Sequence, residues 1–201
     1  MMRYLIVSIC AFGMLASCAP EQLQPADYRA YVDDPSHGLR VSKAMPKHTF
    51  ELHYRPAPYV ALKELRGAQT PDTTWLNERT SKLKNLQHFV FRVKCSPGED
   101  LLKGHLTEEQ DYYNRIDYYH SYMPDDLRLI DGQDTLAPAL FHYERAYDIG
   151  PYHTFVLAFP VAEGSESSDK ELIWNAWTLG YGPVHLRVKG SAIEQLPQLY
   201  L

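Results

Sequence analysis

Several motifs that would identify a familiar chemistry are missing from this sequence of 201 residues. It contains no HExxH, no CxxC pair, no GxSxG and no glycine-rich phosphate loop, so the usual zinc-protease, thiol-redox, hydrolase and nucleotide-binding signatures are absent. Two SxxK matches begin at Ser81 and Ser167, but neither has an SDN or KTG partner. The sequence therefore predicts no serine acylase, and we expect no metal and no cofactor.

Basic charge and cysteine are also scarce. The chain has 20 lysine and arginine residues against 25 acidic ones, and its formal net charge of −5 gives no electrostatic footprint for nucleic acid. Of the cysteines, Cys10 and Cys18 lie near the N-terminus, which leaves only Cys95 and no intramolecular disulfide. Because Cys95 alternates in phase with the apolar residues of FVFRVKC, we expect a buried and unreactive thiol.

The N-terminal stretch MMRYLIVSICAFGMLASC has the layout of an export signal. Arg3 precedes an uncharged run from Tyr4 to Met14, which is much shorter than the roughly 20 residues that cross a bilayer. Leu15-Ala16-Ser17-Cys18 resembles the lipobox of bacterial lipoproteins, in which the cysteine is acylated and the chain is cleaved just before it. The resemblance implies removal of residues 1–17 and lipidation of Cys18; the alternative is an ordinary signal peptide.

A lipidated cysteine predicts where the protein is found. Two or more acyl chains, such as palmitate, anchor a protein stably where one chain does not, so we expect a membrane-bound protein of the cell envelope. Ala19 follows the cysteine and, by the enterobacterial sorting rule, favours the outer membrane, on either its periplasmic or its surface face. Residues 18–38 are polar and rich in proline, which predicts a tether. The alternative is that Tyr28, Tyr31 and Val32 dock this segment on the domain as a short helix or an edge strand.

Residues 39–201 predict a single globular domain of the α+β class. Its first part contains a strand in TFELHY and another at 88–95, with helical insertions within 58–122, expected at 58–66, 71–86 and 108–122. The part from 126 to 190 is rich in short strands separated by turn sequences, with strands expected at 127–130, 136–147, 152–160, 172–179 and 184–189. Together these patterns predict a mainly antiparallel, immunoglobulin-like β-sandwich with inserted helices.

The tyrosine-rich helix within 108–122 carries several candidate site residues. Thr107 and Gln110 match a capping box at its start. One stripe of its side chains is expected to pack on a sheet: Tyr112, Ile116, Tyr119 and Met123. This leaves three partly exposed rings as candidate ligand contacts: Tyr113, Tyr118 and Tyr122. Asp117 and His120 lie three residues apart on one face, where they form either an acid–base pair or a solvated hydrogen bond.

Two more aromatic residues are candidate ligand contacts. Trp174 and Trp177 are three residues apart in an expected strand, so they point to opposite faces. One ring can then lie in the core while the other is exposed and stacks on a sugar, and Trp174 is included among the candidates. Tyr181 lies between two glycines in GYGP, which predicts an exposed ring on a loop.

Polar residues in FHYERAYDIGPYHTF have the types that bind metals or transfer protons. Strand alternation places His142 and Glu144 on the outer face of the sheet and His153 at the end of the core face. Two ligands are too few for a zinc site, so this pair is at most a weak polar site. Asp148 is explained by turn chemistry, and Arg145 is expected to pair with a carboxylate at the sheet edge.

The order of the lipobox, LHYRPAPYVALKEL, FVFRVK and DLRLIDGQDTLAPALFHYERAYDIGPYHTFVLAFP is similar to that of uncharacterised envelope lipoproteins of Bacteroidota-type bacteria. This resemblance implies an envelope protein and transfers no activity. We expect a non-enzymatic, membrane-anchored binding or assembly module for an envelope protein or glycan, because tyrosine suits such contacts. The alternative is an envelope glycan or peptidoglycan hydrolase, which needs two acid–base groups in one cleft.

Overall fold

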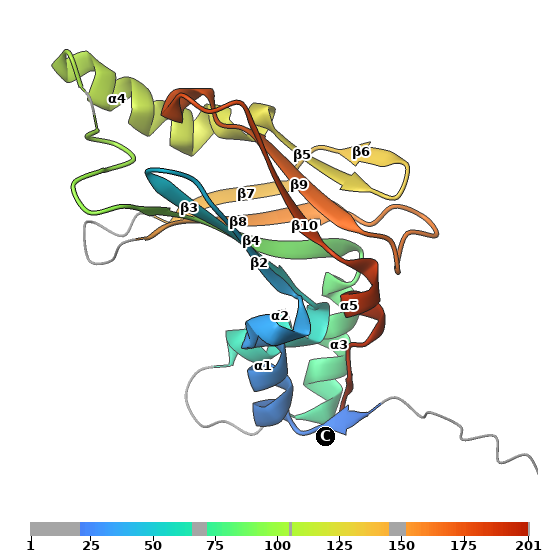
Figure 1. Ribbon diagram of the computed structural model, residues 1–201. Helices are drawn as coiled ribbons and strands as arrows, with labels where there is room; N and C mark the ends of the chain where they lie inside the picture. The colour runs from blue at the N-terminus through green and yellow to red at the C-terminus, as the bar shows by residue number, and fades with distance from the viewer. Residues whose placement is uncertain (1–20, 66–71, 105, 145–151, 201) are drawn as a thin grey trace, which may run out of the picture.

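The computed structural model describes residues 21–65, 72–104, 106–144 and 152–200 (Figure 1). It contains two larger antiparallel sheets together with helices, so the predicted α+β class is confirmed. One sheet has the order β2-β3-β4-β8-β7, formed by Arg40–Ala44, His48–Arg55, Leu86–Cys95, Tyr152–Pro160 and Leu140–Glu144. The other has the order β10-β9-β5-β6, formed by Pro183–Val188, Lys170–Asn175, Leu127–Asp131 and Asp134–Leu136. A short parallel pair joins β1 (Gln22–Leu23) to β11 (Gln198–Leu199).

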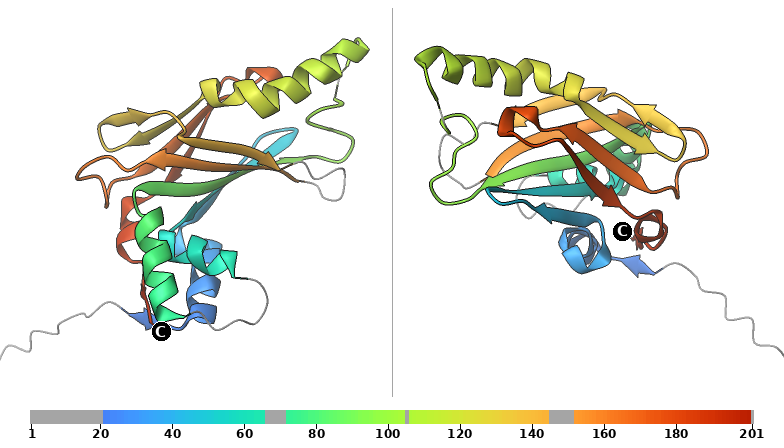
Figure 2. Two further views of the ribbon diagram at one scale, coloured as in Figure 1. Left: turned by 180° about the vertical axis from the view of Figure 1, so that it is seen from behind. Right: turned by 45° about the horizontal axis from the view of Figure 1, so that its top comes forward.

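The two larger sheets face each other across one core (Figure 2). Alternate residues of each strand point inward, as a half-buried strand requires. Phe91 of β4 packs edge-to-face on Trp174 of β9, with ring centroids 5.6 Å apart. Phe50 of β3 meets the same indole at 5.8 Å, so aromatic rings from both sheets interlock at the centre of the core.

A second core lies under the helices that pack on the outer side of the five-stranded sheet (Figure 1). These are α1 (Pro25–Asp33), α2 (Ala57–Glu64) and α3 (Thr73–Leu83), with the 3₁₀ turn η1 (Pro35–His37) and α5 (Gly190–Glu194) beside them. The helices expected at 58–66 and 71–86 correspond to α2 and α3. The strand β2 and the helix α5 were not anticipated from the sequence, and α1 was anticipated only as an alternative to a tether.

Helix α1 corrects the tether expected at residues 18–38. Tyr28 and Val32 lie four residues apart on one face of α1, and both are buried in the second core. His53 of β3 places its Nε2 2.9 Å from the carbonyl oxygen of Val32, which fixes the helix to the sheet. Residues 22–37 therefore belong to the folded domain, as the alternative of a docked helix described.

The tyrosine-rich segment lies on the far side of the molecule from α1–α3 (Figure 1). It is α-helical only as α4 (Glu109–Asp117), and it continues as a π-helical turn, η2 (Tyr118–Tyr122), and a 3₁₀ turn, η3 (Met123–Asp126). The packing stripe is confirmed: Tyr119 and Met123 are buried, and Tyr112 and Ile116 pack against the same core.

The start of α4 is capped one residue later than the sequence predicted. The carboxylate of Asp111 accepts hydrogen bonds from the backbone N–H groups of Thr107, at 2.9 Å, and Glu108, at 3.1 Å. The hydroxyl of Thr107 also donates to Asp111, at 2.6 Å. Gln110 instead donates to Asn114 on the helix surface, at 3.0 Å. The capping interaction at this end is therefore centred on Asp111, and the expected Thr107–Gln110 pair is wrong.

Two expected strands differ from the prediction. The one at 136–147 is divided into β6 and β7, because Pro138 cannot donate to a strand ladder. The one at 172–179 ends at Asn175, and the chain then forms the 3₁₀ turn η4 (Trp177–Leu179). No helix within the described ranges is long and apolar enough to cross a membrane.

Candidate ligand site between α4 and η4

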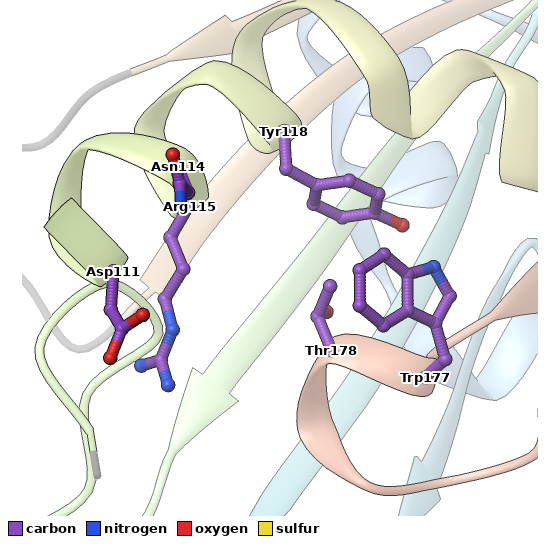
Figure 3. A pocket seen from close by; sticks show the side chains of 6 residues that line it. All are labelled: Asp111, Asn114, Arg115, Tyr118, Trp177 and Thr178. Atoms are coloured by element: carbon purple, nitrogen blue, oxygen red, sulfur yellow. The ribbon is translucent and has the colours of Figure 1, made fainter. Parts of the chain in front are cut away.

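Two adjoining cavities lie between the α4–η3 segment and the turn η4. The first, of 380 Å³, is lined by Asp111, Asn114, Arg115, Tyr118, Trp177 and Thr178 (Figure 3). The second, of 530 Å³, is lined by Asn114, Asp117, Tyr118, Tyr122, Asp125, Asp126 and Trp177. Both volumes fall within the roughly 300–1,000 Å³ typical of ligand pockets. We call the two cavities together the Trp177 groove, because Trp177 lines both.

Local backbone geometry places Trp177 in the groove. After β9 the chain turns through η4, where Leu179 donates to the carbonyl of Ala176 at 3.0 Å and Gly180 donates to that of Trp177 at 2.9 Å. Gly180 has φ 73°, a left-handed conformation that favours glycine, and it closes the turn. The turn leaves 57% of Trp177 exposed.

Trp174, by contrast, lies in β9 and is buried, so the expectation that it contacts a ligand is wrong. Its position in the strand directs the ring into the core between the sheets. Its indole N–H donates to the hydroxyl of Tyr118 at 3.3 Å, which makes it a support for the groove from below. The exposed member of the tryptophan pair is Trp177, which is one of the two outcomes that the spacing allowed.

Asp126 holds the aromatic pair of the groove in place. Its Oδ2 accepts hydrogen bonds from the indole N–H of Trp177 and from the hydroxyl of Tyr118, both at 2.8 Å. The two rings meet edge-to-face, with centroids 5.3 Å apart and planes at 74°. Burial raises the pKa of Tyr118, and the hydrogen bond to Asp126 raises it further, so the hydroxyl stays protonated. The Trp177 ring is therefore held by polar contacts at its edge while its surface stays exposed.

The remaining polar groups of the first cavity lie at its other end (Figure 3). The guanidinium of Arg115 donates to the backbone carbonyls of Leu102, at 3.5 Å, and Gly104. Hydrogen bonds from Thr107 and Glu108 lower the pKa of Asp111, so this carboxylate is ionised at neutral pH. An ionised carboxylate accepts hydrogen bonds and is unsuited to act as a general acid.

The other tyrosines predicted as contacts divide into two groups. Tyr122 is 62% exposed and lines the groove, and Tyr113 is 50% exposed on α4 but lines neither cavity. Tyr181 is half-buried, because the chain after Gly180 folds back and brings its hydroxyl within 3.1 Å of His48 Nδ1. Its ring also packs edge-to-face on Phe50, so the expected exposed loop contact is corrected to a residue at the edge of the core.

Asp117 and His120 face different surroundings, although they are close in sequence. Asp117 lines the groove, whereas the ring of His120 packs on that of Tyr143 in β7, with centroids 4.9 Å apart. In the described part of the chain the two side chains form no hydrogen bond or ion pair with each other. They are therefore not assembled as an acid–base pair.

The β7–β8 hairpin has the predicted register. Tyr143 is paired with Phe155 and faces the core, while His142 and Glu144 lie exposed on the other face. His153 is on the core side, with its Nδ1 2.7 Å from the hydroxyl of Tyr143. The histidines are thus separated by the sheet, and among the described residues no three His, Cys, Asp or Glu side chains gather as a metal site.

Three predictions concern residues that lie outside the described ranges. These residues are Cys18, Arg145 and Asp148, so lipidation and the expected ion pair of Arg145 stay predictions. Cys95 is described and is half-buried in β4. Burial, together with the nearby Asp100, raises the pKa of its thiol to about 11, as an unreactive cysteine requires.

A buried polar cluster was missed by the sequence analysis. Asp131 and Lys170 are paired across β5 and β9, both are buried, and they form an ion pair. The Asp131 carboxylate also accepts hydrogen bonds from Gln87 of β4 at 2.6 Å, Ser165 at 2.7 Å and Ser168 at 2.6 Å. Burial tends to raise the pKa of Asp131, but the hydrogen bond from Lys170, together with these three bonds, outweighs burial and lowers the pKa. The alternation of LRLID, which turns Asp131 inward with the leucines, was the available signal.

Comparison with known proteins gives no match. No protein-family model matches the chain, and no curated protein or solved structure matches it. The chemistry of the Trp177 groove therefore has to be inferred from its own geometry, which combines one fixed and exposed indole with carboxylate, amide and hydroxyl groups around it.

Proposed function

We propose that the protein is a lipid-anchored, non-enzymatic binding module of the cell envelope, and that its glycan or protein ligand contacts the Trp177 groove. The anchor is supported by the lipobox that ends at Cys18. The ligand site is supported above all by Trp177, a large aromatic ring that is 57% exposed yet fixed by Asp126. An exposed ring held in one orientation loses little freedom on binding, which favours recognition.

Binding fits the groove better than hydrolysis does. Glycoside hydrolysis needs a protonated carboxylic acid opposite a second carboxylate, and the pKa of Asp111 is shifted in the wrong direction for that acid. Asp126 has two hydrogen-bond donors on a single oxygen, which suits it to position the rings. His142 and Glu144, the other polar pair, lie on β7 outside the groove.

The immunoglobulin-like form of the sandwich belongs to the same proposal. Its support is limited to general architecture: two antiparallel sheets of short strands enclose one aromatic core. Sandwich proteins often carry their ligand contacts on segments between strands, and the α4–η3 segment and η4 are also connections between strands.

The proposal is tested by capture from an envelope extract of the native host with the immobilised full chain. Trp177→Ala should reduce the material captured, and Trp75→Ala is the matched control. Trp75 is also an exposed tryptophan, at 37%, but it lies on α3 on the other side of the molecule (Figure 1). Equal capture by both variants would show that the groove is not the contact surface.

Lipidation requires its own test. Cell fractionation of the wild type and of Cys18→Ala should place the wild type with the membranes and release the variant. A membrane-bound variant would contradict the lipid anchor. Because the groove is unaffected by this change, the result bears only on attachment and leaves ligand capture to be judged separately.

A further inference from the structure

Trp177 offers an apolar stacking surface and has no polar atom left to contribute. Its only polar atom, Nε1, donates to Asp126 at 2.8 Å. The edge-to-face contact with Tyr118 supports one side of the ring, and Trp174 in turn donates to Tyr118. What a ligand meets is therefore the π face of a ring whose orientation is already set.

Groups that bind hydroxyls surround this ring. The Oδ1 of Asn114 accepts from Gln110 at 3.0 Å, which leaves its NH₂ group to donate into the groove that it lines. Asp117 and Asp125 supply oxygens that only accept, and Thr178 has a hydroxyl that can do either. Such a mixture matches a ligand whose hydroxyl groups both donate and accept hydrogen bonds.

Charge narrows the class of ligand. The described residues that line the two cavities include four aspartates and one cation, Arg115. The guanidinium of Arg115 already donates to two backbone carbonyls, so the net charge of the groove is negative. This negative potential disfavours ligands with carboxylate, sulfate or phosphate groups. Ligands with uncharged hydroxyls or with amines are compatible with the groove, because both groups donate hydrogen bonds to carboxylates.

We infer that the Trp177 groove binds a non-acidic saccharide, with a pyranose ring stacked on Trp177 and its hydroxyl groups bonded to the surrounding side chains. A pyranose has one face formed by C–H groups and an edge formed by hydroxyls, so it complements an apolar ring with polar neighbours. This inference rests on the proposed binding function and specifies its ligand.

A protein ligand fits the same surface less well. The buried centre of a protein–protein interface is depleted of charged residues, because each charge would have to be desolvated. Here the exposed ring of Trp177 is bordered by Asp117, Asp125 and Asp126. A saccharide bonds such carboxylates directly through its hydroxyls, which offsets their desolvation.

The test is direct binding of defined oligosaccharides to the full chain, purified in a zwitterionic detergent that has no sugar head group. An array of neutral and amine-bearing oligosaccharides, with acidic ones such as oligogalacturonate alongside, finds the probe, and calorimetry then gives its Kd. We expect at least one non-acidic probe to bind. Trp177→Ala should weaken that probe at least about tenfold, and Trp177→Phe less.

Trp75→Ala is the control and should leave the Kd within about twofold, and circular dichroism should show that all variants are folded. Binding of acidic probes alone, no binding across the array, or an unchanged Kd in Trp177→Ala would overturn the inference. If the oligosaccharide assay fails but capture from envelope extracts depends on Trp177, the saccharide is rejected as the ligand and the proposed binding function is kept. Failure of both measurements would reject the groove as a ligand site.

Discussion

Replacement of Lys170 by methionine should destabilise the fold strongly. Lys170 and Asp131 are 3% and 0% exposed, so the substitution leaves a carboxylate buried without its cation. Removal of one partner of a buried ion pair costs about 3–5 kcal/mol. Gln87 and the two serines still donate to Asp131, which places the expected loss near the lower end, at about 3 kcal/mol.

Urea unfolding followed by tryptophan fluorescence would measure this loss. For a domain of 150–250 residues, a loss of about 3 kcal/mol corresponds to a fall in Tm of about 6–12 °C. The double variant Lys170→Met/Asp131→Leu is the control, because it removes the unpaired charge and should recover part of the stability. A loss of less than about 1 kcal/mol in the single variant would refute the view that this buried ion pair stabilises the four-stranded sheet.

Three more predictions concern stability. Burial lowers the pKa of His53 to about 4, so below pH 6.5 the unfolded chain binds a proton that the folded chain does not. The free energy of unfolding should therefore fall by about 2 kcal/mol between pH 7 and pH 5. Urea titrations at both pH values would show this fall, and a smaller one in His53→Gln. Tyr28→Ala should cost about 3 kcal/mol in the same assay, because α1 is part of the fold, whereas a tether would tolerate it. Gly190→Ala should prevent or severely weaken folding, as thermal melts would detect, since its Cβ would lie 2.0 Å from the carbonyl oxygen of Ser167.

Regular alternation made much of the fold predictable. β8 was expected at 152–160 and is found there, and the faces of His142, Glu144 and His153 followed from counting along two strands. Apolar alternation is strong in these strands because one face is buried, so a shift of one residue would expose the core. The helix stripe through Tyr119 and Met123 was predictable for the same reason, at the helical period.

The parts that failed depend on contacts between distant segments. Helix α1 is short and polar, and it is held by burial of Tyr28 and Val32 against elements that follow it in the chain. Proline-rich composition alone therefore suggested a tether. Lys170 is buried because it pairs with the carboxylate of Asp131, which lies 39 residues before it in the chain. A pattern of neighbouring residues does not predict such a pair.

The candidate site was predictable in its residue types and not in its shape. Tyr118 and Tyr122 were expected as partly exposed ligand contacts, and both line the groove, although Tyr118 is buried. The tryptophan spacing allowed one exposed ring. Which ring this is depends on β9 ending at Asn175, so that Trp177 lies on a turn. The π-helical turn after Asp117 likewise changes which side chains share a face.

Oxidative footprinting of the full chain, read by mass spectrometry, tests the central claim most directly. Side-chain oxidation is compared with and without an envelope extract from the native host, at Trp177, Tyr122 and Trp75. If the groove is the ligand site, the extract should protect Trp177 and Tyr122 and leave Trp75 unchanged. Unchanged oxidation of Trp177 in an extract from which the chain does capture material would contradict the account.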